Sequence, residues 1–132
     1  NGKIAGGGEV MDRPGYFIRP TIVRDITDGT KLVDEEQFGP VLPVIKYTDQ
    51  ADVVKRANAS PYGLGASVWS SNPERAYEVA QQLEAGTVWI NKHQDLAPHI
   101  PFGGAKNSGM GVEFGEEGLN EFTQLQIINA AR

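Results

Sequence analysis

The alternation of short apolar runs with helix-like segments constrains the fold of this chain most. Strand-forming runs are separated by segments whose apolar side chains recur at helical spacing. Strands joined by helices in this order become parallel neighbours through right-handed crossovers. The sequence therefore predicts an α/β fold with a mostly parallel sheet flanked by helices. Its expected elements are strand 41–47, helix 49–58, strand 64–69, helix 73–84, strand 87–91, helix 114–122 and strand 123–129.

Helix 73–84 carries signals for both of its ends. The side chain of Asn72 can accept a hydrogen bond from the first turn, and Pro73 suits the first helical position because proline has no N–H to satisfy. Gly86 is a typical residue just beyond a helix. Both ends of this helix are therefore predicted from local chemistry.

Composition excludes several functions. The net charge is -5, and no cluster of Lys and Arg could neutralise several phosphates, which argues against a nucleic-acid partner. No apolar run approaches the length of a membrane span, and no secretory leader is recognisable, so we expect a cytoplasmic protein. The chain has no cysteine, which excludes disulfides and a thiol nucleophile within these residues. It begins at Asn1 rather than Met, which we interpret as a fragment or a trimmed chain.

Segment 92–110 has no periodicity and follows the predicted strand 87–91. Sites in parallel sheets form in the loops beyond the carboxyl ends of strands, and loops of this length are often functional. His93, Asp95 and His99 lie in this segment, but two histidines and one aspartate in a loop that contains proline are a weak metal signature. We favour a solvated or pocket-rim loop and predict no metal.

A second candidate site precedes strand 41–47. Glu35, Glu36 and Phe38 are followed by Gly39-Pro40, and proline locks its own backbone and restricts the residue before it. The side chains before the proline therefore leave the strand in a fixed direction. The run is either a helix end and a turn, with the ring in the core, or a carboxylate and a flat ring presented to a ligand.

A series of motifs, in order and at compatible spacing, resembles the aldehyde dehydrogenase superfamily. The resemblance covers nearly the whole chain and is close to the C-terminal part of such enzymes. It implies the C-terminal half of the catalytic domain over 1–122 and a C-terminal oligomerisation strand over 123–132. The motifs are Phe17…Pro20-Thr21, Glu36-x-Phe38-Gly39-Pro40-Val41, Asn58…Tyr62-Gly63-Leu64, Ala85-Gly86-Thr87-Val88-Trp89-Ile90-Asn91, Pro101-Phe102-Gly103-Gly104-x-Lys106-x-Ser108-Gly109 and Gly111-x-Glu113.

The resemblance implies that two residues bind an NAD or NADP cofactor. In the family, the glutamate at the position of Glu36 accepts hydrogen bonds from the hydroxyls of the nicotinamide ribose. An ionised carboxylate suits this role because it only accepts hydrogen bonds and can hold two hydroxyls. The phenylalanine at the position of Phe38 packs near the nicotinamide ring. Glu35 is then interpreted as a surface acid at a helix end.

The resemblance also implies a substrate pocket. Phe102 matches an aromatic residue that lines the aldehyde pocket, and Leu96 falls where the family places side chains at the mouth of the substrate tunnel. Glu113 is a candidate for a buried proton path, as proposed for some relatives. Lys106 and Ser108 are interpreted as polar residues that stabilise a turn.

The implied reaction oxidises an aldehyde to a carboxylic acid with NAD(P)+ through a cysteine thioester. The nucleophile and the base lie upstream of the matched region, so no catalytic residue is expected within this chain. The chain alone is therefore predicted to be an inactive piece of an enzyme whose substrate is an aldehyde. The family uses no catalytic metal.

Two alternatives stay open on the residues alone. The chain could be a stand-alone interaction module that self-associates through the apolar strand Thr123 to Ile128, because an exposed strand edge favours pairing. The parent could also be a relative that acts on semialdehydes or acyl phosphates, with the same hydride transfer but without the hydrolysis.

Overall fold

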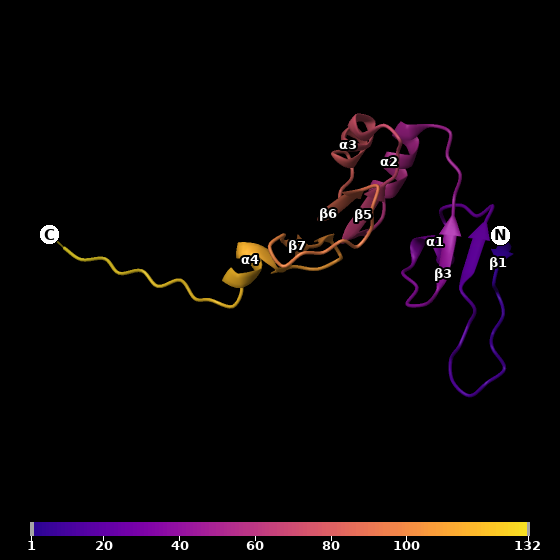
Figure 1. Cartoon of the computed structure of the whole chain (residues 1–132), viewed down its shortest axis with the longest axis horizontal. Coiled ribbons are helices and arrows are strands. Elements are labelled where there is room, and N and C mark those ends of the chain that lie inside the picture. Colours follow the sequence, from indigo (N-terminus) through magenta and orange to yellow (C-terminus); the bar gives the residue numbers. More distant parts are fainter. Residues whose placement is uncertain (1, 132) are drawn as a thin grey trace. The chain divides into compact units, whose positions relative to one another are not determined.

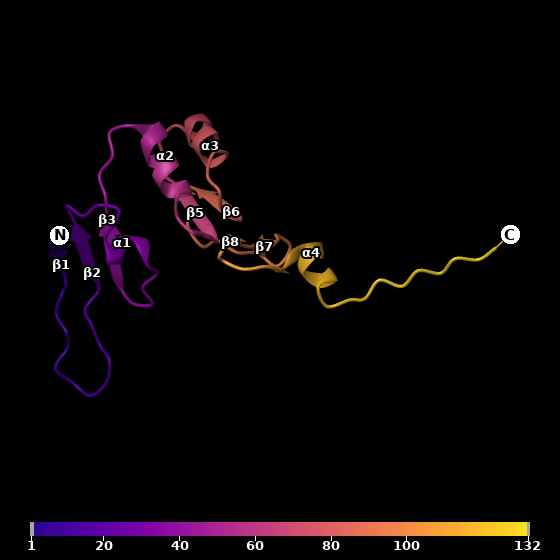
Figure 2. The same ribbon diagram turned by 180° about the vertical axis from the view of Figure 1, so that it is seen from behind.

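The computed structural model describes residues 2–131 (Figure 1). The chain divides into two compact units, one ending at Gln50 and the other beginning at Ala51. Figure 2 shows the same elements from behind. No helix among the described residues is long and apolar enough to cross a membrane.

The first unit is built on a three-stranded sheet with the order β1-β2-β3. Strand β1 (Lys3–Gly6) runs antiparallel to β2 (Thr21–Arg24), whereas β3 (Val41–Val44) runs parallel to β2. The short helix α1 (Lys31–Asp34) lies in the connection between the two parallel strands. A parallel pair requires such a crossover because the chain must return to the starting end of the sheet.

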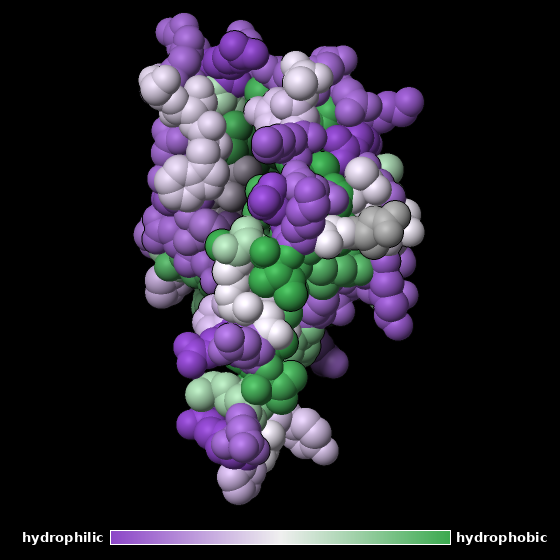
Figure 3. Space-filling model, turned by 90° about the vertical axis from the view of Figure 1, so that its right-hand side faces the viewer, coloured by the Kyte–Doolittle hydropathy of each residue, from purple (hydrophilic) through white to green (hydrophobic). Residues whose placement is uncertain are grey.

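The two faces of this sheet differ in exposure. Thr21 and Val23 of β2 are buried, with 5% and 9% of their surface exposed. Ile22 and Leu42 are direct neighbours in the parallel register and remain 47% and 60% exposed. The space-filling view in Figure 3 also shows apolar side chains at the surface among hydrophilic ones. The first unit therefore leaves apolar strand residues uncovered.

The second unit contains the crossover that the sequence predicts. Strand β5 (Gly65–Val68) is parallel to β6 (Thr87–Ile90), and helix α3 (Pro73–Ala80) joins them and packs against both. Ala76 of α3 is 1% exposed at this contact layer, since its small side chain lets the helix approach closely. Helix α2 (Gln50–Asn58) leads into this arrangement along the chain.

Short antiparallel ladders complete the second unit. Strand β4 (Tyr62–Gly63) pairs with β8 (Ala105–Lys106), and β7 (Phe102–Gly103) pairs with β9 (Val112–Glu113). Helix α4 (Gly115–Asn120) follows β9 directly. Through the β4–β8 ladder, a segment that follows β6 in the sequence lies beside β4, which precedes β5 and β6.

Helix α3 begins as predicted and ends earlier than predicted. The side-chain oxygen of Asn72 accepts a hydrogen bond from the backbone N–H of Arg75 at 3.1 Å, which confirms the predicted cap. The helix ends at Ala80 rather than near residue 84. Beyond it, the N–H of Gln82 donates to the carbonyl of Val79, three residues back, so the last turn tightens out of α-helical geometry.

The prediction of a mostly parallel sheet is wrong. Only β2–β3 and β5–β6 are parallel among the strand pairs of the described residues, whereas β1–β2, β4–β8 and β7–β9 are antiparallel. The strands form four small sheets rather than one. The alternation of helix and strand identified the β5–α3–β6 crossover, but strands of two residues are too short to carry a recognisable period.

Two further expectations differ from the structure. Segment 92–110 is not an unstructured loop, because it contains β7 and β8. The strand predicted over 123–129 does not form in the single chain, where residues 123–131 carry no helix or strand (Figure 1). A strand requires a partner for its backbone hydrogen bonds, and no other strand of the described residues lies in register with this segment.

Strand β6 begins at a close approach between two glycines. A Cβ atom on Gly86 would lie 1.7 Å from the carbonyl oxygen of Gly103. The N–H of Gly86 also donates to the carbonyl of Gly63 at 2.9 Å. Gly86 is therefore required by packing against the β7 segment and not only as a helix terminator.

We predict that Gly86→Ala destabilises the chain by about 3 kcal/mol, because a methyl group there overlaps a backbone atom that cannot rotate away. Gly6→Ala is the control, since no atom lies within 4 Å of a Cβ built at Gly6. Urea unfolding of both variants measures the difference. Equal midpoints would show that the backbone opens at little cost.

Candidate functional site

The loop between α1 and β3 presents Glu36 and Phe38. The amide of Gln37, between them, donates to the carbonyl oxygens of Leu32 and Glu35, the latter at 2.7 Å. This inward-facing amide ties the loop to α1. Glu36 is exposed and Phe38 is 98% exposed, so the two flanking side chains reach solvent from an anchored backbone.

The far end of this loop is held by β2. The carbonyl of Pro40 accepts a hydrogen bond from the N–H of Thr21 at 2.8 Å, where β2 and β3 begin in parallel register. The loop is therefore anchored at both ends. An exposed carboxylate that accepts hydrogen bonds and a bare aromatic face are groups that a polar, flat ligand can use.

In the second unit, the structure brings Phe102 and Glu113 together. They are cross-strand partners in the antiparallel β7–β9 pair, which places their side chains on the same face of the ladder. Phe102 is partly buried, whereas Glu113 is exposed in this chain. A ring and a carboxylate thus stand side by side on a two-stranded ladder.

Trp89 connects Phe102 to the loop that carries Leu96. The ring of Trp89 lies 6.4 Å from the ring of Phe102 between centroids, at a tilt of 31°. Its indole N–H donates to the carbonyl of Asp95, the residue before Leu96, at 3.1 Å. Leu96 itself is 46% exposed. Sequence reasoning placed Trp89 in a strand and in one of the family motifs, but gave it no role beside the pocket.

The predicted loop residues have structural contacts of their own. Asp95 forms an ion pair with Lys92 at 2.5 Å, and the rings of His93 and Trp89 form a T-shaped pair at 5.3 Å between centroids. Among the described residues, no group of three or more His, Cys, Asp or Glu side chains is placed to hold a metal ion. His93 and Asp95 thus contribute to loop structure.

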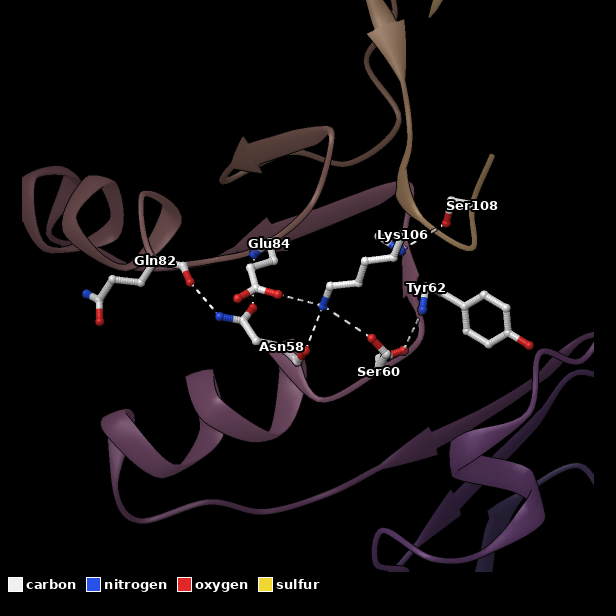
Figure 4. A network of polar contacts seen from close by, with 8 residues as sticks. Asn58, Ser60, Tyr62, Gln82, Glu84, Lys106 and Ser108 are labelled. Carbon is white, nitrogen blue, oxygen red and sulfur yellow. Dashed lines mark hydrogen bonds and ion pairs between the residues drawn. The ribbon is translucent and has the colours of Figure 1, made fainter. Parts of the chain in front are cut away.

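Lys106 joins three segments of the second unit (Figure 4). Its Nζ donates to the carbonyl oxygens of Asn58 at 2.6 Å and Ser60 at 3.2 Å, and lies 2.9 Å from Oε2 of Glu84. Asn58 ends α2, where carbonyls have no helical partner and a positive charge is favourable. The lysine side chain is 23% exposed, so water screens these contacts only partly.

Asn58 and Ser108 extend this network. The side chain of Asn58 donates to the carbonyl of Gln82 at 2.7 Å and accepts from the N–H of Glu84 at 2.9 Å. The hydroxyl of Ser108 accepts from the N–H of Gly63 at 2.9 Å. These contacts agree with the predicted role of the lysine and serine in stabilising the turn. They hold the segment after Phe102 against the start of the unit.

The candidate residues therefore form two groups, one in each unit. Glu36 and Phe38 share the α1–β3 loop. In the second unit, Phe102 lies beside Trp89, Glu113 pairs with Phe102, and Leu96 follows the residue whose carbonyl the Trp89 indole binds. Sequence reasoning missed Gln37, whose amide anchors the first group. The sequence did contain a signal for this role, because Gln37 lies between the two candidate binding residues. Alternate side chains of an extended segment point to opposite sides, so the middle one is expected to face inward.

Comparison with known proteins identifies the family. The aldehyde dehydrogenase family profile matches residues 1–128. Human retinaldehyde dehydrogenase 3 is 44% identical over 126 residues, which are 96% of this chain and 25% of that protein. The chain belongs to the aldehyde dehydrogenase family. It spans about a quarter of the length of the relatives that it matches.

Solved structures of the family have the same fold. A mutant aldehyde dehydrogenase from Bacillus cereus is 44% identical with a TM-score of 0.88, over 93% of this chain and 25% of that chain. The Mycobacterium tuberculosis aldehyde dehydrogenase complexed with NAD+ is 40% identical with a TM-score of 0.87, over 93% of this chain and 26% of that chain. The structure is thus a mixed α/β part of the aldehyde dehydrogenase fold.

We predict that Lys106→Met destabilises the chain by about 2 kcal/mol, because two backbone carbonyls and Glu84 lose a charged donor. Lys31→Met is the matched control: the ammonium of Lys31 lies 3.5 Å from Glu35, but its side chain is 83% exposed. That change should cost less than about 0.5 kcal/mol. Thermal unfolding monitored by circular dichroism measures both. Equal losses would contradict a structural role for the network.

Proposed function

We propose that this chain is the C-terminal part of an NAD(P)-dependent aldehyde dehydrogenase that oxidises an aldehyde to a carboxylic acid. Membership of the family supports the reaction class, and the solved relative complexed with NAD+ supports the cofactor class. The observation that carries the proposal is the anchored α1–β3 loop, which presents a carboxylate and a bare ring at the family's motif positions. When bound, the cofactor supplies the hydride acceptor.

Glu36 and Phe38 are the proposed cofactor contacts. Glu36 accepts hydrogen bonds from two neighbouring ribose hydroxyls, which suits an exposed carboxylate with several acceptor sites. Phe38 offers its uncovered face to a planar ring and limits the ring's orientation. These two side chains suit the cofactor chemically, because a hydrogen-bond acceptor for hydroxyls and an apolar aromatic ring lie two residues apart.

Phe102 and Leu96 are the proposed walls of the aldehyde pocket. Phe102 is held by its β7–β9 pairing, and the Leu96 segment is held by the indole of Trp89. Glu113, beside Phe102, is the proposed member of a proton path, since a carboxyl group can both accept and release a proton.

The nucleophile and the water-activating base belong to other parts of the parent enzyme in this proposal. The chain has no cysteine, so it cannot form the thioester by itself. The uncovered strand residues Ile22 and Leu42 support packing against further protein. We retain the division into a partial catalytic domain over 1–122 and an oligomerisation segment over 123–132, together with a cytoplasmic location.

The decisive experiment measures aldehyde-dependent reduction of NAD+ or NADP+ by the full-length gene product. We expect carboxylic acid to form together with NADH or NADPH, and no turnover by the 132-residue chain alone. An upstream reading frame without a cysteine, or a gene product without turnover on any aldehyde, would instead support an interaction module. Formation of an acyl phosphate or acyl thioester would indicate the relative without hydrolysis.

We predict that Glu36→Gln in the full-length enzyme raises the KM for the cofactor about tenfold, because the amide replaces one acceptor oxygen and removes the charge that strengthens both ribose hydrogen bonds. Glu35→Gln is the matched control one residue away. Its carboxylate lies 3.5 Å from the exposed Lys31. Steady-state kinetics with varied cofactor measure both. An equal change in the two variants would remove Glu36 from the binding site.

We further predict that self-association of the full-length protein depends on the segment Thr123 to Ile128. Ile127 and Ile128 are 81% and 85% exposed in the single chain. Ile127→Asp should shift the protein to a smaller oligomer, because a buried, unpaired charge opposes strand pairing. Light scattering after gel filtration measures the mass. Gln126→Asp controls for charge, and an unchanged mass for Ile127→Asp would contradict the proposal.

A further inference from the structure

We infer that Trp89 is a positioning residue that sets the spacing between Phe102 and Leu96, and thereby the width of the aldehyde pocket. The inference rests on the proposed function, because it concerns the two residues proposed to line that pocket. Trp89 itself lies on β6 and is only 6% exposed, so it is buried while the residues that it positions are more exposed.

The position of the indole is set by the parallel β5–β6 pair. Trp89 is the partner of Ser67 in this register. Its six-membered ring occupies the space above Gly65, where a Cβ atom would lie only 2.7 Å from Cζ3. The absence of a side chain at Gly65 therefore lets the ring lie close to the sheet. The strand pair, rather than the loop, decides where the indole stands.

From this fixed position, the indole controls the Leu96 segment through one hydrogen bond. Its N–H donates to the carbonyl of Asp95 at 3.1 Å, next to Leu96 along the chain. The ion pair between Lys92 and Asp95 spans the turn after β6, and this turn brings the Asp95 carbonyl to the indole. Among the described residues, no other hydrogen bond to the Asp95 carbonyl is seen. Removing the indole N–H would therefore leave this carbonyl without its partner and loosen the backbone next to Leu96.

The same indole contacts Phe102 through its ring. The centroid separation of 6.4 Å lies within the range in which aromatic rings attract each other. The ring of His93 also packs against the indole, at 5.3 Å between centroids and 74° between ring planes, and keeps the loop close to it. One rigid side chain thus contacts Phe102 through its ring and, through its N–H, the backbone of the residue before Leu96.

The consequence concerns aldehyde size. A long aldehyde that contacts both walls needs their spacing held, whereas a short aldehyde needs few contacts beyond the reacting carbon. Loosening Leu96 should weaken binding of the long aldehyde without changing the reacting groups. The effect should therefore appear in KM and not in kcat.

The test uses the full-length enzyme with acetaldehyde and octanal as substrates. Trp89→Phe replaces the indole by a smaller aromatic ring that has no N–H. We expect the KM for octanal to rise about fivefold, as for the loss of one hydrogen bond, while the KM for acetaldehyde and both kcat values change less than about twofold.

Trp69→Phe is the matched control. Trp69 also donates through its indole N–H, to the hydroxyl of Ser67 at 3.3 Å, but it is 66% exposed and lies outside the contacts that hold the two walls. We expect both KM values to stay unchanged in this variant. Circular dichroism and thermal unfolding establish that each variant is folded.

Gly65→Ala tests the same inference without removing the indole. The added methyl group forces the ring of Trp89 to shift, so octanal should again lose binding relative to acetaldehyde. This variant gives the answer if Trp89→Phe does not fold. If the folded variants keep the wild-type ratio of the two KM values, the positioning role is wrong while the proposed function stands. If the wild-type enzyme oxidises neither these nor other aldehydes, the proposed function itself is wrong, and the inference with it.

Discussion

The ammonium group of Lys106 is the contact on which the arrangement of the second unit most depends. It contacts the end of α2, the turn after it and the segment before β6, and its own backbone belongs to β8. These segments are far apart in sequence, and the ladder that joins β4 to β8 is only two residues long. A short ladder contributes few hydrogen bonds, so a partly buried charge with three acceptors contributes a large share of the stability there.

The two candidate groups are built alike: an inward-facing polar contact anchors the backbone, and neighbouring side chains are left exposed. In the first unit, the amide of Gln37 holds the loop while Glu36 and Phe38 reach solvent. In the second, the indole of Trp89 holds the loop while Leu96 stays partly exposed. Such loops present binding groups with little conformational freedom to lose, which favours affinity.

Prediction from the sequence succeeded where the signal was local. The Asn72 cap and the β5–α3–β6 crossover follow from capping chemistry and from the spacing of apolar residues, and both are present. The aldehyde dehydrogenase resemblance, carried by short motifs, is confirmed by the match over residues 1–128. The sheet was mispredicted because short strands such as β7 and β9 have no period, and the strand over 123–129 because pairing needs a partner that local sequence does not supply.

The sequence by itself determined the family, the reaction class to propose and the residues to test, because motif residues such as Glu36 and Phe102 are recognisable wherever they fold. Only the tertiary structure decided how those residues are held. Phe102 and the backbone before Leu96 both contact the indole of Trp89, and the room for that indole depends on the absence of a side chain at Gly65. These contacts join residues from different elements, and their distances arise from packing in three dimensions rather than from any local pattern.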